Sequence, residues 1–134
     1  STQIETPIGK RVGLKREIHS VQEWLTFIRF LPPVLSEQQM SNLDKNLKFT
    51  AWTNAEIQFE WFMKAIASDY ALAYPAVESF LSKVGRRKFI LPLYIQLYSF
   101  EHTKGNALAW FEQFKENYHA VSSNSIAAAL ELSK

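Results

Sequence analysis

Helix-start signals recur along this sequence at nearly constant spacing, and they limit the possible folds more than any other feature. Three of the signals are capping boxes, in which a Ser or Thr precedes a Glu or Gln by three residues and each side chain accepts a backbone N–H of the other. The predicted boxes are Ser20 with Glu23, Ser36 with Gln39, and Thr53 with Glu56. Further helices are predicted to begin between Asp69 and Tyr74, near Lys88 with Pro92 in its first turn, after Thr103, and at about Asn124.

Alternate starts along this series are 33 or 34 residues apart, as for Ser20 and Thr53 or for Asp69 and Thr103. Helices of about four turns that pair through short loops and repeat at this period favour stacked antiparallel hairpins. The consensus residues of tetratricopeptide repeats are missing at their offsets. We therefore predict an all-α fold, a right-handed α-α superhelix of the armadillo or HEAT kind with about seven helices. Residues 20–134 form this predicted domain, and residues 1–19 are interpreted as a linker or tail.

The composition agrees with helices and excludes several classes of protein. The chain has only four glycines and no long stretch of alternating apolar and polar residues, so a sheet is not expected. It has no cysteine, which excludes disulfides and thiolate metal sites. Its apolar stretches are too short for a membrane span. No signal peptide is visible, so a cytoplasmic location is the expectation, although a fragment of an exported precursor would look the same.

The charge is concentrated at the start of the chain. Residues 1–20 hold four basic and two acidic side chains, and the other 114 residues hold 11 of each. Nucleic-acid binding normally requires a basic face on the folded body. Because the body is neutral overall, we expect no nucleic-acid partner.

The titratable residues show no local catalytic or metal-binding motif. The three histidines, His19, His102 and His119, are far apart, and no HExxH occurs, so a zinc site could only be assembled from distant helices. Glu56 and Glu60 share a predicted helix face with Lys64, which favours a solvated stripe over an acid/base pair. We therefore predict that this chain alone has no catalytic residues, holds no metal or cofactor, and is inactive as an enzyme.

The basic turn from Gly85 to Lys88 is the one local arrangement that suggests binding. Gly85 is predicted to end a helix in a left-handed conformation. The next helix begins within a few residues, so its unpaired N–H groups and positive dipole end lie beside Arg86 and Lys88. This pattern is typical of an anion site, in which Arg binds a carboxylate through two hydrogen bonds, but a hydrated basic turn gives the same pattern.

Residues 84–94 read VGRRKFILPLY and resemble a family segment of Gly-Arg-x-Lys-Phe, two variable residues, Pro-Leu and an aromatic. The family is that of the C-terminal domains of leukotriene A-4 hydrolase-type zinc aminopeptidases, and the upstream segments look like those of its bacterial members. The resemblance extends over about residues 20–130. The other segments that carry it are Glu23-Trp24-Leu25 with Phe27, Asn54-Ala55-Glu56-Ile57, Asp69-Tyr70, Tyr74-Pro75-Ala76, and Tyr118-His119 before a short helix.

This resemblance implies a function for the basic turn. It implies a helical solenoid that packs on a zinc-containing catalytic domain of the same polypeptide and forms one wall of the active-site cleft. By position, Arg86 and Lys88 would bind the carboxylate of a peptide substrate, whereas Arg87 falls at a variable position and would be solvated. The zinc ligands and the glutamate base would belong to upstream domains. A free-standing helical-repeat scaffold for protein partners is the alternative, and an HExxH motif upstream in the reading frame would distinguish the two.

Overall fold

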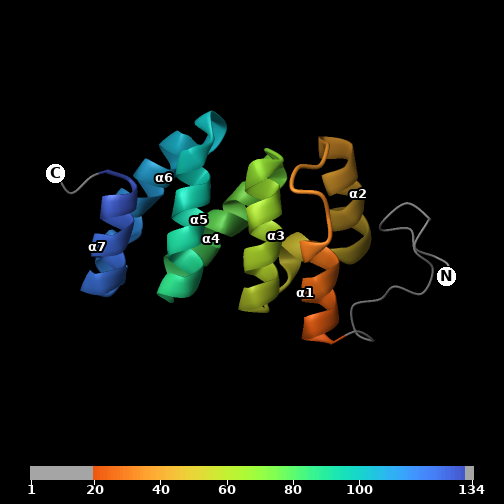
Figure 1. The fold of residues 1–134 in the computed structure, drawn as a ribbon, viewed down its shortest axis with the longest axis horizontal. Coiled ribbons are helices and arrows are strands. Elements are labelled where there is room, and N and C mark those ends of the chain that lie inside the picture. The colour runs from red at the N-terminus through yellow and green to blue at the C-terminus, as the bar shows by residue number, and fades with distance from the viewer. Residues whose placement is uncertain (1–19, 132–134) are drawn as a thin grey trace. The chain divides into compact units, whose positions relative to one another are not determined.

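A computed structural model describes residues 20–131 of the chain, and all regular structure within that range is helical (Figure 1). Seven α-helices and three short 3-10 turns occur there, and no strand. The predicted all-α class is confirmed, whereas the superhelical arrangement stays a prediction. The predicted tail, residues 1–19 with His19, and the last three residues lie outside the described range. The chain divides into two compact units, the first ending at Tyr70 and the second beginning at Ala71.

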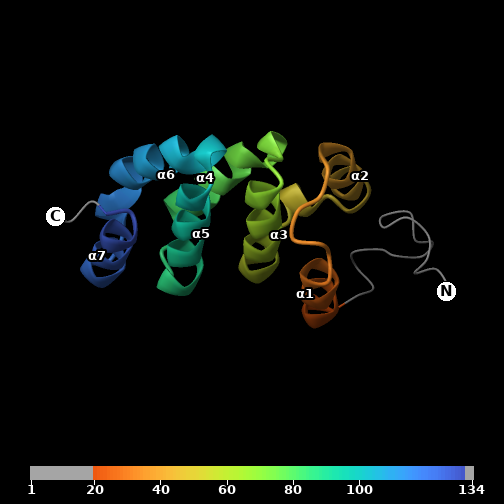
Figure 2. The ribbon, with the colours of Figure 1, turned by 45° about the horizontal axis from the view of Figure 1, so that its top comes forward.

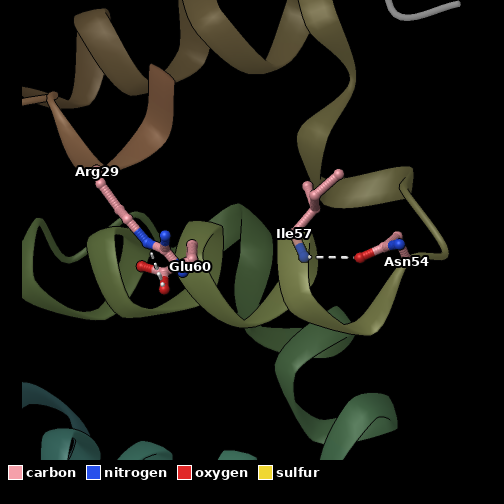
Figure 3. A network of polar contacts seen from close by, with 4 residues as sticks. All are labelled: Arg29, Asn54, Ile57 and Glu60. Atoms are coloured by element: carbon pink, nitrogen blue, oxygen red, sulfur yellow. Dashed lines mark hydrogen bonds and ion pairs between the residues drawn. The ribbon is translucent and has the colours of Figure 1, made fainter. Parts of the chain in front are cut away.

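The first unit contains α1 (Val21–Arg29), α2 (Glu37–Leu47), η2 (Phe49–Ala51) and α3 (Ala55–Ala67). The predicted boxes at Ser20 and Ser36 are confirmed, since both reciprocal hydrogen bonds are present in each. The third box is wrong by one residue. Asn54, not Thr53, is the cap of α3, and its Oδ1 accepts the N–H group of Glu56 at 2.9 Å. It also accepts the N–H group of Ile57 at 3.0 Å (Figure 3).

The core of the first unit is aromatic. Trp24, Phe49 and Trp61 are fully buried, with ring centroids 5.6 Å apart for Trp24 and Phe49 and 4.9 Å apart for Phe49 and Trp61. Beside them, the carboxylate of Asp44 accepts hydrogen bonds from the N–H and hydroxyl of Thr50 and from the hydroxyl of Tyr70. Such a network satisfies polar groups that burial would otherwise leave without partners.

The polar stripe of α3 differs from its prediction. Glu60 binds Arg29 of α1, with Nε and Oε2 3.1 Å apart (Figure 3). Lys64 donates through Nζ to the carbonyl of Leu31 at 3.0 Å, next to the end of α1. Only Glu56 of the three predicted stripe residues is exposed. Glu60 and Lys64 therefore fasten α3 to the α1 segment, and the interpretation as a solvated stripe was wrong for both.

The second unit contains η3 (Ala71–Ala73), α4 (Tyr74–Lys83), α5 (Arg87–Ser99), α6 (Glu101–Phe114), η4 (Lys115–Asn117) and α7 (Ala120–Ala129). Here α5 packs against both α6 and α7, and Figure 2 shows α5 and α7 side by side. The predicted start of α4 is confirmed, with Pro75 in its first turn. Burial of apolar side chains from α4 to α7 forms the core of this unit, including Leu81, Leu93, Tyr94 and Ile126.

In the second unit the predicted start of α5 near Lys88 is confirmed, since the helix begins at Arg87, but Pro92 lies in its second turn and not in the first. Two other predicted boundaries were wrong. Thr103 does not precede α6 but lies in its first turn, where its buried hydroxyl donates to the carbonyl of Leu97 at 2.6 Å. The last helix begins at Ala120 rather than Asn124, and its cap His119 makes no side-chain cap hydrogen bond, so no capping pattern marked the start.

Candidate functional site

The turn between α4 and α5 carries the predicted anion-binding residues. Val84, the C-cap of α4, has an extended backbone. Gly85 follows it, but its φ lies outside the left-handed region, so the prediction of a left-handed helix-ending glycine was wrong. A Cβ built on Gly85 meets no atom within 4 Å. The chain therefore leaves α4 in an extended conformation and enters α5 at Arg87, with Arg86 as its N-cap.

Arg86 and Lys88 both lie against the ring of Phe89. The guanidinium carbon of Arg86 lies 5.8 Å from the ring centroid, and Nζ of Lys88 lies 5.0 Å from it. Phe89 is itself buried and meets Phe80 of α4 edge to face at 6.1 Å. Contact with an aromatic face favours a cation and restricts its side chain. The two residues predicted to act together therefore share one fixed apolar support, while both remain exposed.

Arg87 does not share that support. Its Nε donates to Oγ of Ser125 in α7 at 3.1 Å. The side chain is exposed, as predicted, but it is not merely solvated, because it links the first turn of α5 to α7. Arg87 therefore serves a different purpose from its two neighbours.

An open hollow of about 490 Å³ lies beside this turn. One wall is the turn itself with its three cationic side chains, and the other wall is formed by Asn117, His119 and Ser122 around the start of α7. None of the described residues that line the hollow is acidic. Sequence reasoning missed this second wall, because it lies some thirty positions beyond the basic turn and has no motif of its own. With three cationic side chains and no acidic one among the described residues that line it, the hollow has an electrostatic potential that favours an anion.

Two helices begin at the hollow. Arg86 caps α5 and His119 caps α7, and neither helix has a side-chain hydrogen bond at its cap. The first N–H groups of an α-helix lack intrahelical acceptors, and they lie at the positive end of the helix dipole. The hollow therefore combines backbone donors from two helices with the charges of Arg86 and Lys88.

Buried tyrosines hold the two walls in place. The hydroxyl of Tyr118 donates to the carbonyl of Leu81 in α4 at 2.7 Å. Since a phenol has one proton, the hydroxyl of Tyr94 in α5 must be the donor in its 2.9 Å hydrogen bond to the oxygen of Tyr118. Burial raises the pKa of both phenols above the ordinary value, and the hydrogen bond to Tyr118 raises the pKa of Tyr94 further. This chain of hydrogen bonds connects α4 and α5 to the residue before His119.

Of the two described histidines, His119 lines the hollow and His102 does not. The ring of His102 stacks on Phe100 with centroids 5.3 Å apart. Within residues 20–131, no group of three or more His, Cys, Asp or Glu side chains is arranged to hold a metal ion. In the same part of the chain, no helix has both the length and the apolar character needed to cross a membrane.

Fold and site together define an all-helical domain with a basic hollow between two helix N-termini. Residues 19–130 match the family model of the C-terminal domain of leukotriene A4 hydrolase. The chain therefore belongs to this family, as the resemblance of its basic turn predicted.

Curated relatives with a similar segment are leucine aminopeptidases of yeasts. Leucine aminopeptidase 2-1 of Meyerozyma guilliermondii is 30% identical over 87 residues, which are 65% of this chain and 14% of the relative. Leucine aminopeptidase 2-2 of Scheffersomyces stipitis is 32% identical over 79 residues, which are 59% of this chain and 12% of the relative. The matched region is thus a small part of the length of these relatives.

Proposed function

We propose that this chain is the C-terminal accessory domain of a zinc aminopeptidase, where Arg86 and Lys88 bind the free carboxylate of a peptide substrate. The family membership and the names of the yeast relatives support the class of enzyme. The observation that carries the site is the pairing of Arg86 and Lys88 on the Phe89 ring at the edge of a hollow without acidic lining residues.

The chemistry of a peptide carboxylate suits this arrangement. A carboxylate that enters a cleft loses water, and charged donors must replace the lost hydrogen bonds. Arg86 offers a planar fork that fits both carboxylate oxygens, and Lys88 adds a second, more flexible charge. The helix N-termini add backbone donors without a change in conformation.

The zinc ion that the family implies has no set of ligands in the described part of this chain. We therefore assign it to the catalytic domain of the same polypeptide, which is the proposed partner of this domain. The residues described here bind and orient the substrate, and no step of bond cleavage is assigned to them.

The test is the kinetics of the full-length parent enzyme. Removal of one partner from a desolvated charge pair costs about 2–5 kcal/mol, so Arg86→Ala is expected to lower kcat/KM for free-acid peptides by roughly thirty- to four-thousandfold. Lys88→Ala is expected to cost less, because a flexible ammonium group fixes geometry less well.

Substrate peptides with an amidated C-terminus distinguish binding of the carboxylate from a structural role. The loss in Arg86→Ala is expected to disappear for them, since they never form the contact. Lys83→Ala, which removes an exposed charge from the end of α4, is the matched control for net charge. Equal slowing of free-acid and amidated peptides by Arg86→Ala would show that Arg86 does not recognise the carboxylate.

A further inference from the structure

We propose that the hydroxyl of Ser122 is a further ligand-binding group of the hollow and donates a hydrogen bond to the carboxylate that Arg86 and Lys88 hold. This inference rests on the proposed function and extends it to α7, a helix that carries none of the predicted site residues. Ser122 is the third residue of α7 and lines the hollow on the side facing the basic turn.

The burial of Ser122 without a partner is the observation that points to a ligand. Ser122 is 5% exposed, and Thr103 is the other buried polar residue in the described part of the chain. The hydroxyl of Thr103 donates to the carbonyl of Leu97, whereas that of Ser122 makes no hydrogen bond with any group of residues 20–131. Buried hydroxyls in native proteins normally have partners, so such an exception requires an explanation.

A serine inside a helix can donate to the carbonyl of the residue four positions earlier. Ser122 lies in the first turn of α7, and the residue four positions earlier, Tyr118, precedes the cap and has an extended backbone, so it offers no such local partner. Ser122 instead lines the hollow, where a ligand can accept the hydrogen bond of its hydroxyl. Its position in the first turn of α7 places it together with the N–H groups that the cap residue His119 leaves without a side-chain acceptor.

A carboxylate has enough acceptor capacity for all of these groups. Its two oxygens offer about four lone-pair sites, so the fork of Arg86 leaves sites for a second donor. A short, neutral hydroxyl at a fixed helix position adds a directional hydrogen bond, which the mobile ammonium of Lys88 does not supply. Ser122 thus selects for a carboxylate placed against the start of α7, because its hydrogen bond contributes far less binding free energy to an uncharged amide in the same place.

The inference is tested by nuclear magnetic resonance titration of the 134-residue chain with two probes, N-acetylglycine and N-acetylglycinamide. The wild-type chain is expected to bind the acid more tightly than the amide, with shifts of the amide signals of Val121 and Ser122. Ser122→Ala is expected to weaken binding of the acid by about tenfold, the usual effect of one hydrogen bond to a charged group. Ser123→Ala, one position further in the same turn, is the matched control and is expected to keep wild-type affinity.

Thermal unfolding separates a ligand-binding hydroxyl from a structural one. Because the hydroxyl has no partner within the described chain, Ser122→Ala is expected to leave the unfolding midpoint unchanged or to raise it. The pair Ser122→Thr and Ser122→Val isolates the hydroxyl from any general loosening of α7, because the two side chains have the same shape and differ in hydroxyl against methyl. A midpoint lower in Ser122→Val than in Ser122→Thr would show that the hydroxyl has a structural partner and would overturn the inference.

Arg86→Ala separates this inference from the proposed function. Loss of acid binding in Arg86→Ala together with full binding in Ser122→Ala overturns the role of Ser122 and leaves the carboxylate site intact. Equal affinity of the wild-type chain for the acid and the amide, or no shift at the hollow, contradicts both proposals. Weaker binding in both variants supports both.

Discussion

Arg87 illustrates how residues of one charge type in one turn come to have different roles. Its hydrogen bond to Ser125 directs the side chain toward α7, while Arg86 and Lys88 lie on Phe89. An exposed contact of this kind contributes up to about 1 kcal/mol. We therefore expect Arg87→Ala to lower kcat/KM of the parent by less than about fivefold, far less than Arg86→Ala.

The comparison is made with the same free-acid peptide for both variants. Unfolding of Arg87→Ala in denaturant checks that the loss of the Ser125 contact costs little stability. A loss of activity as large as that of Arg86→Ala would assign the two arginines the same role, against the geometry.

The hydroxyl of Tyr118 connects three elements of the second unit, since it both donates and accepts a buried hydrogen bond. Tyr118→Phe leaves the carbonyl of Leu81 and the hydroxyl of Tyr94 without this partner. We expect the free energy of unfolding to fall by about 1–3 kcal/mol. Tyr98→Phe, which keeps the ring under Lys104, is expected to change it by less than about 0.5 kcal/mol. Equal effects in urea denaturation would contradict the buried network.

At this scale the sequence named candidate residues. The order of residues around Gly85 pointed to Arg86 and Lys88, and the structure places both on one ring, while their role as carboxylate ligands stays a prediction. Nothing in the sequence pointed to Ser122, because a serine in a helix is ordinary and only burial without a partner distinguishes this one. Nor could it predict the contact of Arg87, since Ser125 is brought near by packing of α5 and α7.

At the scale of the helices, the start of α3 shows most clearly where the sequence pattern and the structure differ. Thr53 and Asn54 are both residues that cap helices, and the pattern with Glu56 favoured Thr53. In the structure Oδ1 of Asn54 accepts two N–H groups at once, which the sequence pattern did not reveal.

Asn54→Ala is expected to lower the free energy of unfolding by about 1 kcal/mol, because two N–H groups at the start of α3 lose their acceptor. Thr53→Ala is the matched control, and its expected effect is below about 0.5 kcal/mol. Chemical denaturation followed by circular dichroism measures both. A larger effect of Thr53→Ala than of Asn54→Ala would show that Thr53 caps α3, as the sequence predicted.

The errors in α5 and α6 have physical causes as well. Pro92 lies in the second turn of α5, where it cannot donate to the carbonyl of Lys88, although propensity alone disfavours such a position. Thr103 resembles a cap in sequence, but burial against the end of α5 gives its hydroxyl the carbonyl of Leu97. Packing within the second unit outweighed local preference in both cases.

At the scale of the whole molecule, the all-α class and the number of helices found in residues 20–131 followed from repeated start signals and from the scarcity of glycine and of alternating stretches. The residues of the hollow come from two stretches far apart in sequence, 85–88 and 117–122. No local pattern predicts that they meet. Their meeting depends on packing of α7 against α5 and on the hydrogen bonds from Tyr94 through Tyr118 to Leu81.

Buried phenols also give the chain a predicted sensitivity to alkaline pH. Burial raises the pKa of Tyr94 and Tyr118 in the second unit and of Tyr70 in the first, and the hydrogen bond to the Asp44 carboxylate raises that of Tyr70 further. In the unfolded chain each phenol has the ordinary pKa of 10.0. Below that pH both states are protonated, so the stability that these phenols contribute is fully present. Above it the unfolded state loses protons first.

The free energy of unfolding is therefore expected to fall as pH rises above 10.0, by about 1.4 kcal/mol per pH unit for each such tyrosine. Denaturation in urea at neutral and alkaline pH measures the slope. The double variant Tyr94→Phe with Tyr118→Phe removes two of the three groups, so its stability is expected to be lower at neutral pH but to fall less steeply above 10.0. A slope equal to that of the wild-type chain would show that these phenols ionise as readily in the folded state as in the unfolded state.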